Sequence, residues 1–251
     1  MNLLRQLAVC WAGLLMAAAA VAGTPVRVFT TAYPPYAAPD LPGQGAAVVM
    51  LRDILQAHGF SPVVDFQPWA RLGAELQAAR YDLVLLAWPG DLRRHGLIGG
   101  PPWFASRLGL YVRRADWRAG GLALADARSL SIGIVRDYAY PDALANHGLD
   151  LQVAGSDAQN LRKLVAGRID AVALERAVGQ YLIKQLGGPV DPSSVSWQEP
   201  AFAVVPIYTA VVPGRPLTDR LQQALAEGLK AYKADGRHTR LLRANDLDPP
   251  P

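Results

Sequence analysis

The chain of 251 residues has a single cysteine, Cys10, and only four histidines. Without a second thiol it cannot form an internal disulfide. After residue 10 it offers neither a thiolate metal ligand nor a cysteine nucleophile. The histidines stand far apart, and none has the spacing of a metal site. We therefore expect no metal and no other cofactor. Stability must come from a hydrophobic core, for which the 51% of hydrophobic residues are sufficient material.

An excess of one charge is also missing. The chain has 25 Lys and Arg against 21 Asp and Glu, for a net charge of +4. The basic residues are scattered and do not form a stripe with interleaved aromatic residues. We therefore expect a solvated surface and no nucleic-acid binding.

Long hydrophobic runs are absent apart from one, at residues 7–21. Arg5 precedes this run, and the small-x-small pattern of residues 20–22 follows it, which predicts a cleaved secretory signal peptide at residues 1–22. The alternative is a membrane anchor, but the run is shorter than the roughly 20 residues that span a bilayer. We expect a periplasmic protein, because an oxidising compartment suits a chain without thiols.

Strand-like and helix-like segments alternate after residue 23, which predicts an α/β fold with mainly parallel sheets. The stretch 89–103 is rich in Gly, Pro and Arg and predicts a loop. A second α/β series begins at Ser129. The two series predict two lobes, one of residues 23–112 with 207–251 returning to it, the other of residues 113–206. Two crossings between the lobes make a hinge, with a ligand cleft at the interface.

Several motifs occur in a characteristic order: YPPY at 33–36, FQPWAR at 66–71, YDLV at 81–84, DAQNLRKL at 157–164 and GRIDAV at 167–172. With these motifs the chain resembles the extracellular solute-binding protein family 3, the periplasmic amino-acid-binding type of ABC-transporter receptor. The resemblance implies two α/β lobes joined by two strands that close on a small polar solute. It also implies docking to an inner-membrane ABC permease. We expect a monomer.

The resemblance also implies two charged poles for a zwitterionic ligand. An Arg in the loop after the third strand would hold the carboxylate. Arg93 or Arg94 falls at that place, with Arg93 favoured, although the family's Thr-x-Glu before the Arg is missing. Glu175, at the end of a later strand, would hold the amine. The alternatives are a solvated loop Arg and a Glu that caps the following helix. Asp170 resembles a residue that supports the fold.

Aromatic walls would come from Tyr33 and Tyr36, whose loop is stiffened by two prolines, with Trp69 and Trp88 as further candidates. Each Trp could instead be a packing residue. In the second lobe, Arg136 and Tyr138 lie in a turn before a predicted helix at 138–147. The backbone N–H groups at the start of that helix could meet an anion, and Tyr138 could close the cleft.

Three functions remain open. The first is a binding protein for an amino acid or small organic acid that feeds an importer. The second is an orphan or sensory binding protein. The third is an enzyme, since some relatives on this fold dehydrate small acids. An enzyme needs a general acid or base in the cleft. Because no nucleophile–base pair has a recognisable spacing, we expect a binding protein without catalytic residues.

Overall fold

The computed structural model describes residues 23–145, 148–185 and 192–250. The predicted signal peptide at 1–22 lies outside the described residues. Within those residues, no helix is both long enough and apolar enough to cross a membrane.

The first lobe is built on a parallel sheet of β1 (Thr24–Thr30), β2 (Phe60–Phe66) and β3 (Leu83–Ala87), with β1 in the middle. α2 (Ala46–Ala57) and α3 (Leu72–Gln77) connect these strands. β3 is buried along its whole length. Leu83 and Leu85 belong to the core shared with α2, whereas Val84 belongs to a second core cluster with Leu72 of α3. The sheet is therefore covered on both faces, as its continuous apolar run predicts.

The second lobe repeats this pattern. β6 (Ser131–Val135) lies between β7 (Asp150–Ala154) and β8 (Ala171–Glu175), and all three strands run parallel. The helices α5 (Asp142–Ala145), α6 (Asp157–Val165) and α7 (Arg176–Gln185) alternate with them. Short 3₁₀ turns complete the described chain: Pro42–Gln44, Trp69–Arg71, Arg114–Asp116, Leu124–Ala127 and Pro192–Ser194.

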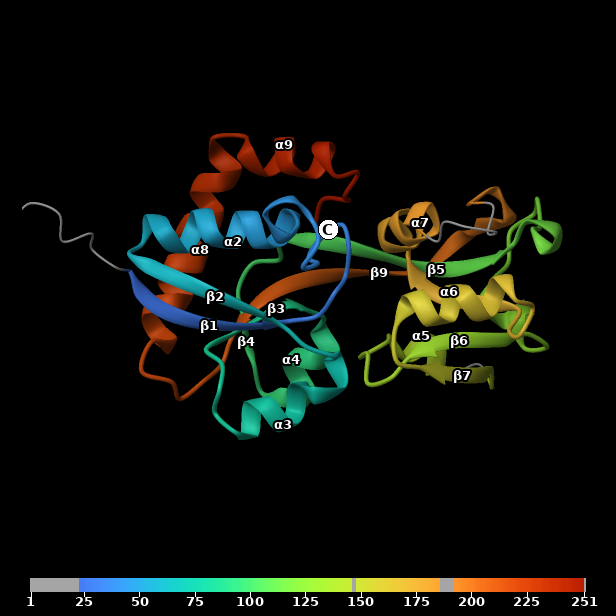
Figure 1. The fold of residues 1–251 in the computed structure, drawn as a ribbon, viewed down its shortest axis with the longest axis horizontal. Helices are drawn as coiled ribbons and strands as arrows, with labels where there is room; N and C mark the ends of the chain where they lie inside the picture. The colour runs from blue at the N-terminus through green and yellow to red at the C-terminus, as the bar shows by residue number, and fades with distance from the viewer. Residues whose placement is uncertain (1–22, 146–147, 186–191, 251) are drawn as a thin grey trace, which may run out of the picture.

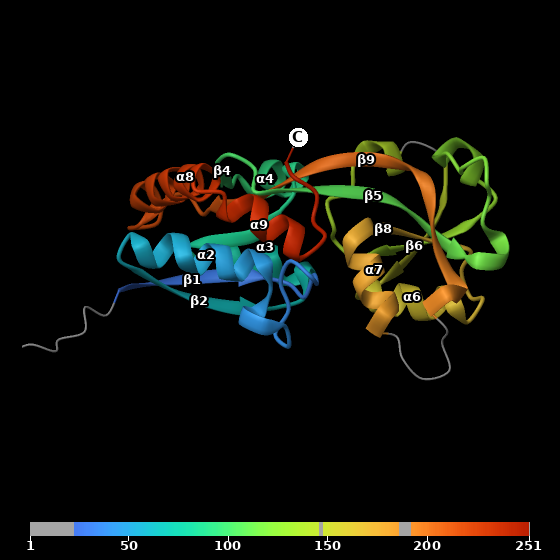
Figure 2. The same cartoon turned by 90° about the horizontal axis from the view of Figure 1, so that it is seen from above.

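Two long strands join the lobes, β5 (Phe104–Arg113) and β9 (Val195–Val211), and they pair antiparallel to each other (Figure 1). The ends of β9 pair with β3 in the first lobe and with the outer half of β5 in the second. Figure 2 shows both strands running from one lobe to the other. The predicted two-lobed α/β fold with a two-strand hinge is confirmed.

The predicted lobe boundaries at 112/113 and 206/207 fall within these two strands. β5 already pairs with β8 from Leu108 onward, and β9 pairs with β3 from Tyr208. The exact boundaries stay a prediction.

The last helices, α8 (Thr218–Ala234) and α9 (Arg237–Ala244), lie against the first lobe. The Tyr232 hydroxyl of α8 donates to Asp53 Oδ2 of α2 at 3.1 Å. Gly228 allows the close approach of the two helices, because a Cβ there would lie 2.3 Å from the Ile54 side chain. In α9, His238 Nε2 lies 2.7 Å from the Trp103 carbonyl oxygen.

The predicted loop at 89–103 is wrong, because it contains α4 (Pro89–His95) and the short strand β4 (Ile98–Gly99). Pro89 occupies the first helical turn, where its missing N–H leaves no bond unmade. Asp91 accepts the Trp88 backbone N–H at 2.9 Å, and Gly96 ends the helix in the left-handed conformation. The Pro and Gly residues that suggest a loop in the sequence are therefore the residues that begin and end this helix.

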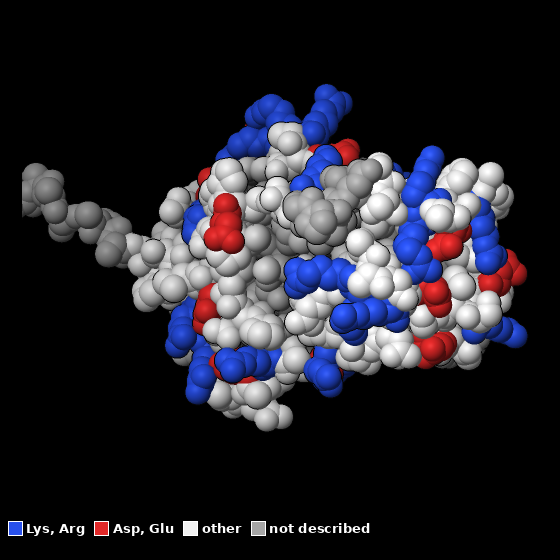
Figure 3. All heavy atoms as spheres, turned by 45° about the vertical axis from the view of Figure 1, so that its right-hand side comes forward, with Lys and Arg blue, Asp and Glu red and all other residues white. Residues whose placement is uncertain are grey.

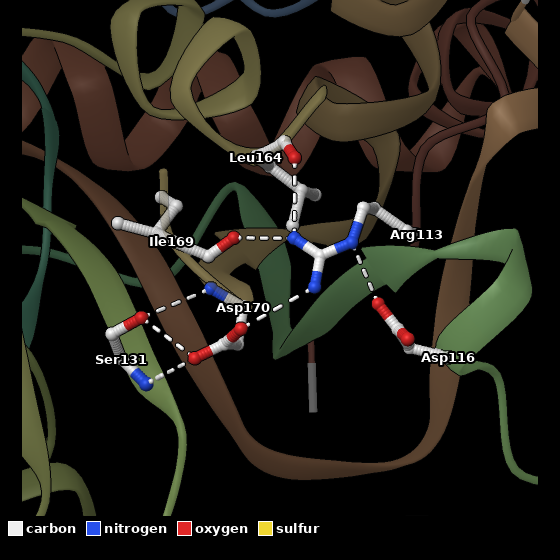
Figure 4. Close-up of polar contacts among 6 residues, drawn as sticks. All are labelled: Arg113, Asp116, Ser131, Leu164, Ile169 and Asp170. Carbon is white, nitrogen blue, oxygen red and sulfur yellow. Dashed lines mark hydrogen bonds and ion pairs between the residues drawn. The ribbon is translucent and has the colours of Figure 1, made fainter. Parts of the chain in front are cut away.

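Asp170 supports the fold of the second lobe, as Figure 4 shows. Its carboxylate accepts hydrogen bonds from the Ser131 backbone N–H at 2.9 Å, the Ser131 hydroxyl at 2.8 Å and Arg113 Nη2 at 3.3 Å. Arg113 also donates to the Ile169 carbonyl oxygen at 2.6 Å. Asp170 thereby connects β6, the start of β8 and the end of β5. The bonds from Ser131 hold the pKa of Asp170 below its usual value.

We expect Asp170→Asn to lower the free energy of unfolding by about 1–2 kcal/mol at pH 7, because an amide cannot replace all the hydrogen bonds that the carboxylate accepts. A carboxyl with a lowered pKa stabilises the fold above its unfolded pKa of about 4, and this contribution is lost as the pH falls further. Urea denaturation should therefore show a smaller difference from wild type at pH 3 than at pH 7. Asp126→Asn, at an exposed position, is the control. An equal difference at both pH values would contradict this account.

Candidate functional site

The double-proline loop presents two stacked tyrosines from the first lobe. The Tyr33 and Ala37 backbones exchange hydrogen bonds of 2.6 and 3.1 Å, which close the loop. The Tyr33 and Tyr36 rings stack with centroids 5.7 Å apart. The Tyr36 hydroxyl donates to the Ala105 carbonyl oxygen at 3.1 Å, whereas the buried Tyr33 hydroxyl has no hydrogen-bond partner. Tyr36 is thus a structural anchor, and Tyr33 has an unused polar atom.

Trp69 and Trp88 come from two other connections of the same lobe and are tied together by Asp91. Trp69 follows β2, and Trp88 lies between β3 and α4. Trp69 Nε1 donates to Asp91 Oδ1 at 3.1 Å, and the Trp88 backbone N–H donates to Asp91 Oδ2. Asp91 is only 1% exposed. These bonds fix the orientation of the Trp69 indole toward the cleft.

Tyr138, from the loop after β6, inserts between these rings from the second lobe. Its ring centroid lies 6.2 Å from Tyr33, 6.5 Å from Trp69 and 5.7 Å from Trp88, in edge-to-face contacts. We call Tyr33, Trp69, Trp88 and Tyr138 the aromatic box. The cavity among them, which Asp91 also lines, measures about 20 Å³. That is room for about one water molecule, so Tyr138 and the three rings from the first lobe nearly fill the space between them.

A larger groove of about 530 Å³ lies next to the box and is lined by both lobes. Its walls include Phe66, Gln67 and Trp69 from the first lobe, and Arg136 and Ser156 from the second. Tyr138 lines both the groove and the box cavity. The groove and the box cavity therefore adjoin at Trp69 and Tyr138.

The two candidate arginines lie on α4. Arg93 and Arg94 are both exposed, and neither lines the box cavity or the groove. Arg94 Nη1 donates to the Asp137 carbonyl oxygen at 3.1 Å and so connects the two lobes. Asp91, two residues before Arg93 on the same helix, does line the box cavity.

Glu175 ends β8 and is 1% exposed. It accepts the Val178 backbone N–H at 2.7 Å and so caps α7, which is the alternative role that the sequence left open. Its other oxygen lies 3.5 Å from the Tyr36 hydroxyl of the first lobe. Glu175 therefore lies where the lobes meet while it caps its own helix.

The predicted anion-binding helix start at Tyr138 is wrong. Asp137 has a left-handed φ of 62°, and α5 begins only at Asp142. The residues from Arg136 to Tyr138 therefore belong to a loop, which offers no helix N-terminus to an anion. Arg136 is exposed on the wall of the groove.

No family model matches the sequence, and no curated protein matches it. Solved structures do match the fold. A histidine kinase sensor domain with similarity to periplasmic binding proteins has a TM-score of 0.78 and 24% identity, covering 90% of this chain and 98% of that one. The substrate-binding protein of an amino acid ABC transporter has a TM-score of 0.73 and 19% identity, covering 87% and 97%. An ancestral arginine-binding protein bound to arginine has a TM-score of 0.73 and 18% identity, covering 89% and 98%.

This chain has the fold of periplasmic binding proteins. The matched structures agree with the resemblance in the sequence, and they cover the chain almost throughout its described length. Because identity is low, the pocket of this binding-protein fold must be interpreted from its own residues.

The sequence did not point to two of the acids at the cleft, Asp91 and Asp157, the second of which lies in the first turn of α6. Asp157 is 4% exposed and accepts the Tyr138 hydroxyl on Oδ2 at 3.2 Å. Its Oδ1 has no hydrogen-bond partner, and neither amide atom of buried Asn160, one helical turn further on, has one. A signal was present, because an acid directly after the helix cap Ser156 is expected to face the helix start.

Burial determines the electrostatics of these acids. Loss of water raises the pKa of Asp157 to about 7, even though the Tyr138 hydroxyl favours its charged form. Burial likewise raises the pKa of Glu175 to about 7 against the opposing hydrogen bonds from Val178 and Ala177. The pKa of Asp91 is also raised by burial. The inner surface of the cleft therefore holds carboxyl groups that are poorly solvated.

Proposed function

We propose that the protein binds a small polar solute between its lobes and holds it by closing about the hinge of β5 and β9. The aromatic box supports this proposal above all, because three rings from one lobe surround a fourth ring from the other. Such a box forms only when the lobes are closed. The groove beside it has a volume typical of ligand sites.

The physiological role that we propose is capture of the solute in the periplasm after export, by a monomer that delivers it to an inner-membrane ABC permease. The binding-protein fold supports this role, since a matched structure is the substrate-binding protein of an amino acid ABC transporter. A sensory role is the second candidate. It is favoured by the match to a histidine kinase sensor domain at 90% coverage of this chain.

An enzymatic function has weaker support from the geometry. Asp157 and Glu175, whose pKa values lie at about 7, could exchange protons near neutral pH. However, Glu175 already caps α7, and Asp157 already accepts the Tyr138 hydroxyl. Binding therefore fits the contacts better than catalysis does.

A single substitution separates binding from stability. In Tyr33→Phe the buried hydroxyl without a partner is removed, so the free protein should be as stable as wild type or slightly more stable. A solute that uses this hydroxyl should bind about tenfold more weakly, corresponding to the roughly 1–1.5 kcal/mol of a typical hydrogen bond. A thermal-shift screen of amino acids, small organic acids and amines, followed by calorimetry on the hits, measures both quantities.

Tyr232→Phe is the matched control, because its hydroxyl bonds to Asp53 between α2 and α8, away from the cleft. It should lose some stability and keep the wild-type affinity. The proposed function is contradicted if no solute of any class raises the melting temperature, or if each hit binds Tyr33→Phe as tightly as wild type.

A further inference from the structure

The charge balance of the cleft indicates the chemistry of the solute. Among the described residues, three carboxylates are buried, namely Asp91, Asp157 and Glu175, and all three lie where the lobes meet. In the same part of the chain no Lys or Arg is buried. The Lys and Arg side chains there are exposed or partly exposed, as the face in Figure 3 illustrates, and two of them lie near the cleft: Arg136 on the groove wall and Arg94 between the lobes. The buried part of the cleft, where only the acids lie, therefore repels an anion and attracts a cation.

No protein cation neutralises these acids. None of the ion pairs found across residues 23–145, 148–185 and 192–250 includes Asp91, Asp157 or Glu175. The backbone N–H of Arg107 donates a hydrogen bond to Glu175, but the Arg107 guanidinium pairs with Glu199 at 3.8 Å. Arg94 lowers the pKa of Asp91, but its effect is the smallest of those that act on this carboxyl, and Arg94 is itself exposed. The acids thus remain without the cation that buried carboxylates ordinarily need.

Buried polar atoms without partners lie beside these acids. The hydroxyl of Tyr33, a residue that lines the box cavity, is one, and Asp157 Oδ1 is another. Tyr33 is close enough to Asp157 and Glu175 for both acids to raise the pKa of its hydroxyl, after the larger effect of burial. Both atoms can accept a hydrogen bond. They therefore suit a ligand that brings N–H donors into the cleft.

The aromatic box adds the walls that a cation prefers. Ammonium and guanidinium groups are attracted to the faces of Trp and Tyr rings, most strongly where water is excluded. Asp91 already has both oxygens bonded to the tryptophan framework, yet a carboxylate has about four acceptor positions. It can therefore take a charge-assisted bond from a bound cation without releasing Trp69.

We propose that the solute is an organic cation with a primary ammonium or guanidinium group and no carboxylate. The cation takes the place of the Tyr138 ring in the box, between Trp69 and Trp88, with Asp91 and the Tyr33 hydroxyl as polar partners. Tyr138 withdraws to admit the cation and then covers it. This inference rests on the proposed function. It departs from the zwitterion that Arg93 and Glu175 would hold, because Arg93 lies outside the cleft.

Matched ligand pairs test the proposal by calorimetry on the chain without its first 22 residues. Putrescine and ornithine differ only by a carboxylate, as do agmatine and arginine, and butane-1,4-diol is the neutral counterpart of putrescine. We expect putrescine or agmatine to bind at least tenfold more tightly than its amino acid, and butane-1,4-diol not to bind. Asp91→Asn should weaken amine binding on the order of tenfold to hundredfold, whereas Asp126→Asn, at an exposed position, should not change it.

If Asp91→Asn disturbs Trp69, which near-ultraviolet circular dichroism would show, Asp157→Asn tests the same charge requirement from the other lobe and should weaken amine binding at least tenfold. The inference is overturned, with the proposed function intact, if ornithine, arginine or an organic anion binds as tightly as the amines. It is also overturned if both Asn variants bind amines like wild type. If no compound of any class binds, both this inference and the proposed function are contradicted.

Discussion

Gly90→Leu should leave the two lobes unable to close. Gly90 lies on α4 of the first lobe, and a Cβ added there would lie 2.7 Å from the Ala139 Cβ and 3.2 Å from the Ala139 carbonyl oxygen of the second lobe. Backbone atoms cannot move aside as a flexible side chain can. Overpacking of this kind costs about 1–3 kcal/mol or more, so solute affinity should fall on the order of hundredfold. Small-angle scattering should show a larger radius of gyration.

The same variant separates closure from folding. Position 90 lies in a helix and does not need a positive φ, so leucine suits its backbone. The thermal unfolding of each lobe should therefore stay close to wild type. Gly120→Leu is the matched control, because a Cβ at Gly120 meets no atom within 4 Å. A wild-type radius of gyration and affinity in Gly90→Leu would show that Gly90 and Ala139 are not in contact in solution.

Raising the pH from 5 to 8 should weaken closure of the free protein. Asp157 faces Tyr33, Tyr138 and Tyr140, and Glu175 faces Tyr36 and Tyr111, with Asp248 and the backbone of Val178 nearby. Both carboxyls have a pKa of about 7 when buried and near 4 in water. A raised pKa means that the buried form holds its proton, so stability is full below pH 4 and is lost as the pH rises through 7.

Between pH 5 and 8, ionisation of each carboxyl should remove on the order of 2–4 kcal/mol from the free energy that stabilises the closed, folded protein. Part of this loss favours opening of the lobes and part favours unfolding. The double variant Asp157→Asn with Glu175→Gln should show a flatter profile. His95 and His238 have lowered pKa values because of burial and act in the opposite sense. The difference between wild type and the double variant therefore isolates the two acids. We expect the difference in radius of gyration and in melting temperature between the two proteins to grow as the pH rises. If neither difference changes with pH, the two acids do not control closure.

The sequence was sufficient to predict the architecture. The two α/β series and the return of residues 207–251 to the first lobe indicate two lobes with a double crossing, and β5 and β9 are those crossings. The prediction succeeds because buried parallel strands such as β3 consist of unbroken apolar residues. Such runs depend little on the rest of the chain.

The aromatic part of the site was also within reach of the sequence, since Tyr33, Trp69, Trp88 and Tyr138 were all candidates and the structure brings them together. The loops that carry them follow strands, and strand ends meet at the cleft. The ligand-binding roles of these residues, and those of Tyr36, Arg93, Arg94, Arg136 and Glu175, stay predictions.

The charged part was not predictable in the same way. Arg93 was favoured because it falls where the resemblance implies a carboxylate-binding Arg, in an expected loop after the third strand. In the helix α4, side chains two positions apart point in different directions, so Asp91 faces the cleft and Arg93 does not. Asp91 also resembles an ordinary first-turn acid. Its contact with the cleft becomes visible only in the structure, where Trp69, from the connection after β2, donates a hydrogen bond to its carboxylate.

The path of β9 also has a consequence for synthesis of the protein. β9 lies between β3 and β5 in the sheet order, so the first lobe includes a strand made near the end of the chain. On the ribosome, β8 can pair with β5 on one side and with β6, the partner of β7, on the other as soon as residue 175 has emerged. In contrast, the edge of β3 stays open until residue 211, and the surface of α2 waits for α8. The lobe that is begun first is therefore completed last, and its nascent form is the one that needs protection from aggregation.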